Sequence, residues 1–502
     1  MKWIITKNNQ VISLNEIPVL HINELKSEII KQYKENKRVI SFFGSKEYSH
    51  TRLYVILSDD KNSELLISSA RFIESHSYIS ITKDISAFHM FEREFFEEFG
   101  IEPLGHPWLK PVRYGKNRFD KTQKIENYPF FKMDGEEGHE VAVGPIHAGI
   151  IEPGHFRFMC NGEKVYHLEI QLGYQHRGVE NLFESNNCFM PHLAESITGD
   201  TVIGHTIAYS NTIEALLRIN ISDKSELIRA VALELERIAV HIGDLGAISN
   251  DIAYLMGNSV FGATRTLVIN TLLSICGSRF GKGLIRVGGV EFDIDNELIK
   301  KILKTLDKVL KDVERMADTM FSSASVLSRL EETGSLSKEK AQIIGLTGMS
   351  ARASGVSIDT RIDHPWGWYK NLSLDKEILE SGDVFARAYI RYKEIKQSIN
   401  IIKELLCKIQ IKNNNKNQEI LRIKTQNTLS ENSMAVSIVE GWRGEIVHVA
   451  LTNNENKIFR YKIKDPSFNN WYGLAVAVRN NGISDFPLCN KSFNLSYCGN
   501  DL

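Results

Sequence analysis

The pattern of apolar and polar residues divides the chain into a mixed first part, a long helical middle and an end that contains strands. Alternation over residues 52–57 and 77–81 predicts half-buried strands. Residues 88–99 place apolar side chains at helical spacing and are followed by Gly100, a residue typical of helix ends. Residues 165–172 alternate again, which predicts a further strand.

The clearest helical pattern covers residues 225–245, with Ser222 and Asp223 placed to cap its beginning. Its apolar side chains fall on one face: Ile228, Val231, Ala232, Leu235, Ile238, Ala239 and Ile242. The charged residues between them are expected on a solvated or subunit-contacting face. Residues 298–327 and 383–406 also predict helices, residues 412–426 predict a polar loop, and strands return from Ala435.

These patterns predict an α+β protein in three parts. Residues 1–110 are expected to form a separate small domain of strands and helices. Residues 111–140 are polar and charged, which is typical of a linker between domains. Residues 141–502 are expected to form a large, mainly helical domain with flanking β hairpins.

The composition excludes several classes of protein. The 502 residues carry 61 Lys and Arg against 62 Asp and Glu, a formal net charge of −1, so no overall charge favours nucleic acid or an anionic membrane. No apolar run reaches the length of about 18 residues that a membrane-spanning helix needs, and the N-terminus lacks the apolar core of a signal peptide. A cytoplasmic location is therefore expected.

Generic motifs add little. The six cysteines include no C-x-x-C pair, which argues against a zinc, iron–sulfur or dithiol site. No G-x-G-x-x-G follows a strand, and the glycine-rich residues 277–283 lack the spacing of a phosphate loop, so a nucleotide-binding fold is not expected. These motifs alone leave an α+β protein without an assigned role.

Seven segments, distributed from residue 141 to near the end of the chain, carry a specific resemblance. They are residues 141–158 (VAVGPIHAGIIEPGHFRF), 172–180 (LGYQHRGVE), 234–241 (ELERIAVH), 345–355 (GLTGMSARASG), 382–387 (GDVFAR), 440–445 (EGWRGE) and 464–468 (KDPSF). Together they resemble the large subunit of membrane-bound, complex I-related [NiFe] hydrogenases and the homologous 49 kDa subunit of respiratory complex I. Residues 92–107 resemble the 30 kDa subunit, which implies a fusion of the two, as in formate hydrogenlyase.

The chain departs from this family at the metal ligands. The resemblance places the four nickel-binding cysteine positions at Thr198, Thr201, Ser496 and Gly499. It also implies that the two segments that carry these positions, one at the first long helix and one at the C-terminal end, converge in the fold. Soft thiolates suit nickel and iron, whereas a hydroxyl is a hard, neutral group and glycine offers no side chain. The resemblance is therefore closest to the energy-converting-hydrogenase-related subunits that lack the nickel cysteines, and no metal site is expected.

The same resemblance implies roles for eight further residues. The expected catalytic residues are His147, His155, Glu180, Asp200 and His205, and the residues expected to organise a cofactor cavity are Arg352, Asp359 and Arg361. Either His147 or His155 can match the quinone-site histidine. Glu180 is expected to shuttle protons, and Asp200 is expected to pair with Arg352 or another cation because an unpaired buried carboxylate is costly.

The function implied is that of a peripheral-arm subunit of a membrane-bound, complex I-like oxidoreductase. Its expected partners are a small iron–sulfur subunit and membrane subunits of the antiporter and proton-channel type, which would hold it on the inner face of the cell membrane. The chain itself is expected to bind no cofactor, while a quinone or another redox carrier accepts electrons in its cavity. The alternative is a non-catalytic coupling subunit, which an abandoned, filled cavity between Thr198 and Ser496 would favour.

Overall fold

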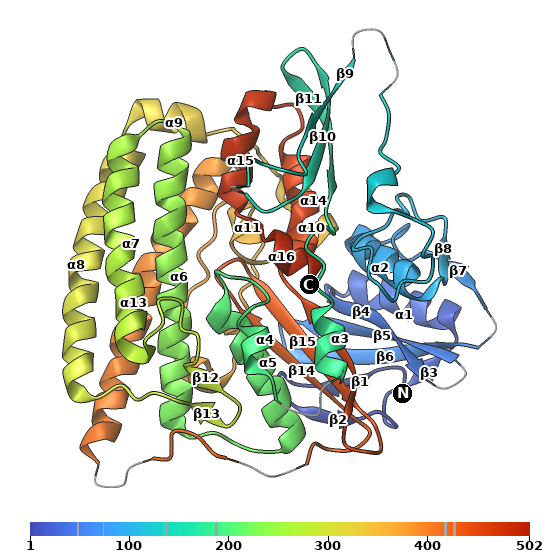
Figure 1. Ribbon diagram of the computed structural model, residues 1–502, viewed down its shortest axis with the longest axis horizontal. Helices are drawn as coiled ribbons and strands as arrows, with labels where there is room; N and C mark the ends of the chain where they lie inside the picture. Colours follow the sequence, from blue (N-terminus) through green and yellow to red (C-terminus); the bar gives the residue numbers. More distant parts are fainter. Residues whose placement is uncertain are drawn as a thin grey trace.

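The computed structural model describes residues 1–47, 50–73, 75–133, 135, 138–149, 151–185, 189–415, 419–424 and 428–502. Parts of the acidic run 134–138 and of the polar segment 412–426 lie outside the described residues. In Figure 1 long helices form one side of the molecule, and sheets built from both ends of the chain form the other side. The mixed helix-and-sheet architecture agrees with the predicted α+β class.

The first sheet is five-stranded and lies in the N-terminal region, with the order β1-β6-β5-β4 and with β3 also paired to β6. The helices and strands of this N-terminal region are β1 (Ile4–Thr6), β3 (Val19–Leu20), α1 (Ile22–Lys34), β4 (Arg38–Glu47), β5 (His50–Asp59), β6 (Glu64–Phe72), β7 (Ser77–Ile79), α2 (His89–Phe99) and β8 (Glu102–Leu104). Strands β7 and β8 pair with each other in a separate two-stranded sheet. Helix α2 packs its phenylalanines against this sheet and ends at Gly100, whose φ of 70° is left-handed. The predicted helix and its stop are confirmed.

A second sheet joins the two ends of the chain. Its order is β16-β15-β14-β2, and β2 (Val11–Ser13) pairs antiparallel with β14 (Ser433–Glu440). The other strands are β15 (Glu445–Thr452) and β16 (Ile458–Lys464). One apolar cluster contains side chains of both sheets, such as Tyr54 and Val449. The expectation of a separate N-terminal unit is therefore wrong in this respect, because strand pairing and core packing interlock the two regions; the boundary at residue 110 stays a prediction.

Buried ion pairs also cross between the two regions. Lys464 Nζ lies 2.7 Å from Glu445, and Glu445 lies 2.5 Å from Arg38 Nη2 of the N-terminal sheet. Arg38 also binds Asp60 at 2.6 Å, and His364 Nε2 lies 3.1 Å from Asp60. Burial raises the pKa of Glu445, but Arg38 and Lys464 outweigh it and lower the pKa to about 2, so the chain of charges is held ionised.

The segment predicted as a linker packs against its surroundings. Val112, Arg113 and Tyr128 are buried, and the Glu97 carboxylate accepts the N–H groups of Val112 and Arg113. The segment leads into a three-stranded sheet with the order β11-β10-β9, formed by β9 (His139–Val143), β10 (His155–Asn161) and β11 (Lys164–Gln171). The strand predicted over residues 165–172 is thus confirmed.

The helical bundle consists of α6 (Asp223–Asp251), α7 (Leu255–Cys276), α8 (Asn296–Phe321) and α13 (Val384–Asn414). Ser222 caps α6 through the N–H of Ser225, as predicted. The expectation of a solvated charged face is wrong, because Glu234, Arg237 and His241 are fully buried. Since α7, α13 and several shorter elements surround α6, its polar positions face protein as well.

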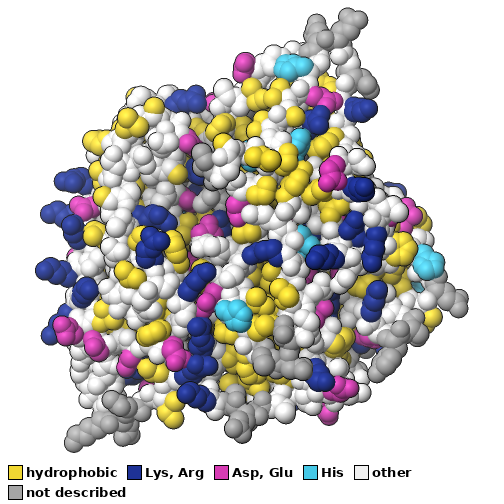
Figure 2. Space-filling model, in the orientation of Figure 1, with side chains coloured by type: hydrophobic (Ala, Val, Ile, Leu, Met, Phe, Trp, Pro, Cys, Tyr) yellow, Lys and Arg dark blue, Asp and Glu magenta, His cyan; other side chains and the backbone are white. Residues whose placement is uncertain are grey.

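The bundle helix α7 is apolar, whereas α8 carries lysines on its exposed face. Among the described helices, α7 is the one that is long and apolar enough to cross a membrane, although much of it packs inside the bundle. The helix predicted over residues 298–327 divides at Ser322 into α8 and α9 (Ala324–Leu330). The exposed face of α8 carries lysines, and Figure 2 shows Lys and Arg side chains along that edge. The remaining bundle helix, α13, extends eight residues beyond its predicted end at 406.

Candidate functional site

Two segments lie in contact: the one that carries Thr198 and Thr201, and the C-terminal one that carries Ser496 and Gly499. These four positions are the ones that the resemblance matches to the nickel ligands. Thr198 and Thr201 precede α5 (Val202–Leu217), and Ser496 caps α16 (Tyr497–Asp501). A Cβ atom placed on Gly499 would lie 2.8 Å from Cγ2 of Thr198. The convergence predicted from the resemblance is confirmed.

Polar side chains fill the space at this point. The same Cβ position on Gly499 lies 2.7 Å from Cγ of Asp465, so this carboxyl group stands where the side chain of a cysteine at residue 499 would begin. Ser496 Oγ is occupied by the Gly499 N–H at 2.9 Å. Thr198 and Asp465 are at most 1% exposed. The donor set does not fit a nickel–iron centre, and the described residues include no group of three or more His, Cys, Asp or Glu side chains placed to hold a metal ion.

We call Thr198, Asp465, Ser496 and Gly499 the Thr198–Ser496 cluster. Asp200 borders this cluster and pairs with Arg443. Arg443 lies in the turn between β14 and β15, and its two Nη atoms lie 2.7 and 2.5 Å from the Asp200 carboxylate oxygens. Trp442 donates to the Asp200 carbonyl at 2.9 Å, which fixes the loop. The cation is therefore Arg443 and not Arg352. The Asp200 side chain is 39% exposed, so the cluster has an edge that solvent reaches.

His205 stands in a buried chain of hydrogen bonds. Its Nε2 lies 3.1 Å from Asp465, its Nδ1 lies 3.1 Å from His448 Nε2, and His448 Nδ1 lies 2.8 Å from the Tyr461 hydroxyl. One arrangement of protons satisfies every group: Tyr461 donates to His448, His448 to His205, and His205 to Asp465. Burial lowers the pKa of His448 well below its ordinary value, which keeps this ring neutral. We call these four residues the relay.

The carboxylate of Glu180 is fixed in place. It accepts the Ile463 N–H at 2.9 Å and lies 3.0 Å from Lys462, so it satisfies an unpaired group on the edge strand β16. Burial raises its pKa, but Lys462, Arg460 and Arg113 outweigh burial and lower the pKa to about 2. A carboxyl group that stays ionised near neutrality is a poor proton shuttle. The geometry therefore favours a structural role over the predicted one.

Glu184, one turn further along α3 (Val179–Ser185), has the opposite character. It accepts the Tyr461 N–H at 3.0 Å, and burial raises its pKa to about 7 despite Arg460. The folded-state pKa therefore lies above the ordinary value of 4.5, and the folded protein holds an extra proton between these two pH values.

We expect Glu184→Gln to change the pH dependence of stability. Any stabilisation linked to the protonated carboxyl is present below pH 4.5 and lost as the pH rises through about 7. Relative to the wild type, the variant should therefore gain about 3 kcal/mol of unfolding free energy between pH 4.5 and pH 8. Urea unfolding at several pH values measures this; a constant difference between the two proteins would contradict the raised pKa.

The two candidate histidines take different environments. His147 Nε2 lies 2.9 Å from the Gly154 carbonyl, and its ring packs against Phe156, which in turn contacts Tyr497 beside Ser496. His155 packs against the ring of Phe130 in the linker. Ring contacts through Phe156 and Tyr497 thus connect His147 to the Thr198–Ser496 cluster. The identity of the quinone-site histidine remains a prediction.

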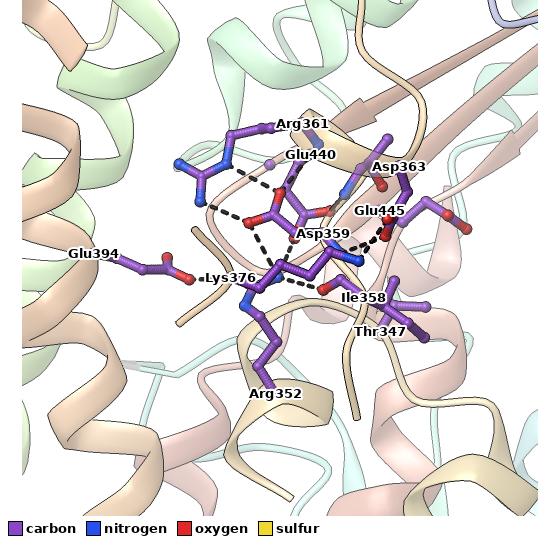
Figure 3. Close-up of polar contacts among 12 residues, drawn as sticks. Thr347, Arg352, Ile358, Asp359, Arg361, Asp363, Lys376, Glu394, Glu440 and Glu445 are labelled. Carbon is purple, nitrogen blue, oxygen red and sulfur yellow. Dashed lines mark hydrogen bonds and ion pairs between the residues drawn. The ribbon is translucent and has the colours of Figure 1, made fainter. Parts of the chain in front are cut away.

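The residues expected to shape a cofactor cavity are buried in an ion network (Figure 3). Arg352, in α11 (Gly348–Ala353), pairs with Glu394 of α13 and with Glu440 at 2.8 Å. Arg361, in α12 (Thr360–Asp363), binds Asp359 at 2.7 Å. All five side chains are at most 2% exposed, so their polar atoms contact protein groups. A role for Arg352, Asp359 and Arg361 in holding a cofactor finds no open surface here.

The network continues along α6 through Glu234, Arg237 and His241. Four buried carboxylates (Glu234, Asp359, Glu394 and Glu440) face three guanidinium groups (Arg237, Arg352 and Arg361). Burial and the nearby Asp359 raise the pKa of Glu440 despite Arg352, which is consistent with a proton that compensates the excess negative charge. Arg237 donates to the carbonyls of Glu440 and Gly441, directly before Trp442, so the network adjoins the Asp200 loop.

Sequence reasoning missed several of the residues that form the site. Asp465 and Arg443 lie inside the KDPSF and EGWRGE segments that carry the resemblance, so their position was visible while their partners were not. His448 and Tyr461 lie on neighbouring strands, and only the β15–β16 pairing places them together. A lone His or Tyr in a strand gives no signal for such a contact.

We expect Gly499→Ala to destabilise the protein by about 1–3 kcal/mol, because a new methyl group would overlap the side chains of Asp465 and Thr198. Gly262→Ala is the matched control: its Cβ would meet nothing within 4 Å, and alanine favours a helix. Thermal unfolding of both variants measures the difference. Equal stability of the two would mean that the space at Gly499 is open.

Comparisons with known proteins agree with the sequence resemblance. Residues 251–501 match the family described as respiratory-chain NADH dehydrogenase, 49 Kd subunit. Formate hydrogenlyase subunit 5 of Escherichia coli (strain K12) is 27% identical over 93% of this chain and 85% of that protein. One of the subunits of the NADH-quinone oxidoreductase of Clostridium beijerinckii is 30% identical over 62% of this chain and 83% of that protein.

A solved structure shares the fold. A chain from the membrane-bound sulfane sulfur reductase, an archaeal respiratory membrane complex, superposes with a TM-score of 0.67 at 21% identity, covering 73% of this chain and 99% of that chain. The resemblance read from the sequence is thereby confirmed for the region that resembles the 49 kDa subunit.

Proposed function

Because the chain belongs to the 49 kDa subunit family of respiratory-chain NADH dehydrogenase, a family of subunits of multisubunit oxidoreductases, we propose that it is the peripheral-arm subunit of a membrane-bound, complex I-like enzyme. A partner iron–sulfur subunit delivers electrons, and antiporter-like and proton-channel subunits in the membrane move ions. The chain is held on the inner membrane face by these partners and binds no cofactor of its own.

The observation that carries this proposal is the replacement of the metal ligands by a polar cluster. The side chains that fill this space are polar and charged, and a buried charge costs stability unless it is paired. Here Asp465 and His205 are fully buried at the former ligand position, and Asp200 with Arg443 forms a solvent-reached edge. This arrangement supplies protons and charge next to a substrate at that edge.

The proposed electron acceptor is a quinone or a sulfur compound. Related proteins are named as subunits of NADH-quinone oxidoreductase, formate hydrogenlyase and a membrane-bound sulfane sulfur reductase. Hydrogen chemistry requires the nickel–iron centre that Thr198, Thr201 and Gly499 cannot hold. At this edge Arg443 can donate to a carbonyl or attract an anionic sulfur group, beside the solvent-reached carboxylate of Asp200.

A second candidate is a non-catalytic coupling subunit. The filling of the space at Gly499 by Asp465 and Thr198 favours it, because these side chains then occupy the position matched to the metal ligand. In this case the ion network of Arg352 would only transmit conformational change between partners.

An acceptor panel on the purified complex tests the proposal. A menaquinone analogue, polysulfide and protons are offered with a chemical reductant, for the wild type and for Asp200→Asn. Under the proposal the menaquinone analogue or polysulfide is reduced, and the Asp200→Asn variant loses about 1–2 orders of magnitude in rate. Activity that Asp200→Asn leaves unchanged would favour the coupling role, and hydrogen evolution with stoichiometric nickel would overturn the proposal.

A further inference from the structure

A polar cavity of about 640 Å³ lies where the two regions of the chain meet, away from the Thr198–Ser496 cluster. Three segments that are distant in sequence form its walls: residues 7–10 before β2, residues 211–221 at the end of α5, and residues 364–370. Ligand sites occur preferentially at such interfaces, and this volume suits a nucleotide-sized molecule.

The walls of this cavity are fixed before any ligand binds. The Asn8 amide donates to the carbonyls of His364 and Ile438, both at 2.9 Å, and its oxygen accepts the Ile438 N–H at 2.9 Å. His364 in turn anchors the interregional ion pairs through Asp60. A preformed cavity pays little ordering cost on binding, which raises the affinity for a small ligand.

The rim of the cavity is basic. Lys7, Arg218 and Lys370 line it and are exposed, and within the described residues none of the three forms an ion pair. Arg218 ends α5 in the left-handed backbone conformation with φ of 53°, where glycine is usual, so the backbone is strained at the point where its side chain lines the cavity. Among the residues that the structure describes, only its Nε atom has a partner, the Ser430 hydroxyl.

Two acidic residues also line the cavity, but they do not balance this charge. Glu214 is engaged by both Nη atoms of Arg229 at 2.9 and 2.6 Å. Glu226 forms no hydrogen bond or ion pair through its carboxyl group among the described residues. Burial and Asp223 raise its pKa, whereas Lys370 and Arg229 act in the opposite direction, so it offsets at most one of the three positive charges. The free charge at the cavity is therefore positive.

The inner wall contains polar atoms without partners. Asn211 Nδ2, Trp366 Nε1 and His364 Nδ1 find no hydrogen-bond partner in the described part of the chain. Their side chains are 7%, 3% and 1% exposed, respectively. Buried polar atoms are nearly always paired. The Asn211 amide and the Trp366 indole are donors, which indicates that a group rich in acceptors belongs there, whereas His364 Nδ1 is an acceptor because its Nε2–H donates to Asp60.

From these observations we propose that the cavity binds a small phosphate-bearing anion of nucleotide size, with Lys7, Arg218 and Lys370 holding the phosphates and the amide of Asn211 and the indole of Trp366 donating from the wall. This site is independent of the function proposed above, because binding alone defines it.

Calorimetric titration of the purified chain with ADP, pyrophosphate and adenosine tests this proposal. We expect ADP and pyrophosphate to bind and adenosine to bind far more weakly, with affinity falling as salt is raised. Binding of pyrophosphate as tight as that of ADP would assign the site to free phosphates, and tighter ADP binding would assign it to nucleotides; both support the proposal.

The double variant Lys7→Met with Lys370→Met should weaken ADP binding by about tenfold or more, since two charge-assisted contacts are lost. Lys304→Met, on the exposed face of α8, is the matched control and should leave binding unchanged. Trp366→Phe tests the wall and should weaken binding severalfold. The proposal is overturned if ADP and pyrophosphate do not bind the wild type at millimolar concentration, or if the lysine variant binds them as tightly as the control.

Discussion

Replacing Arg352 by methionine is expected to lower the free energy of unfolding by about 3–5 kcal/mol, because the change leaves buried carboxylates without their cation. Glu394 and Glu440 both rely on this guanidinium group, and the Ile358 carbonyl accepts from it at 2.9 Å. Urea unfolding of the purified chain at neutral pH measures the loss. The methionine side chain keeps the apolar stem of arginine, so most of the effect reports the lost charge and its hydrogen bonds.

Arg315→Met is the control for this experiment. The Arg315 side chain is 75% exposed and lies 3.9 Å from Asp312, so its removal should change stability by less than about 0.5 kcal/mol. If the two variants lost the same amount, the network of Arg352 would contribute no more than a surface ion pair.

The fold could be predicted from the sequence where a local pattern decides the structure. Helix α6 begins at its predicted cap, and α2 ends at its predicted glycine, because capping and apolar spacing are properties of neighbouring residues. The pairing of β2 with β14 could not be predicted in this way. It joins residues more than 400 positions apart, and no periodicity within either strand names the partner.

The same limit explains the outcome for the site. The resemblance brought Thr198 and Ser496 together correctly, since it carries information about a whole fold. It did not assign Asp200 to Arg443 rather than Arg352, because both arginines lie in segments that resemble the family. Charged positions on α6 were predicted to be solvated because a helix pattern cannot distinguish water from a buried counter-ion. Partners on other elements decide this.

Asp465→Asn is expected to lower the turnover of the purified complex by about 100-fold or more, with its preferred acceptor, if the relay supplies protons to the reaction. Asparagine keeps the size of the side chain but removes the anion that receives the His205 N–H at 3.1 Å. The rate should also lose its dependence on pH and on solvent deuterium in the range where the relay limits turnover. A merely structural role would leave both dependences as they are.

The control for this variant is Asp307→Asn on α8, whose side chain is 65% exposed and pairs with Lys403. It should leave the rate within about twofold of the wild type, as expected for a surface ion pair. Urea unfolding of both variants separates lost catalysis from lost folding. Turnover of Asp465→Asn that matches this control, in a complex that assembles normally, would show that the buried relay holds the C-terminal segment in place without moving protons, and the coupling role would then be preferred.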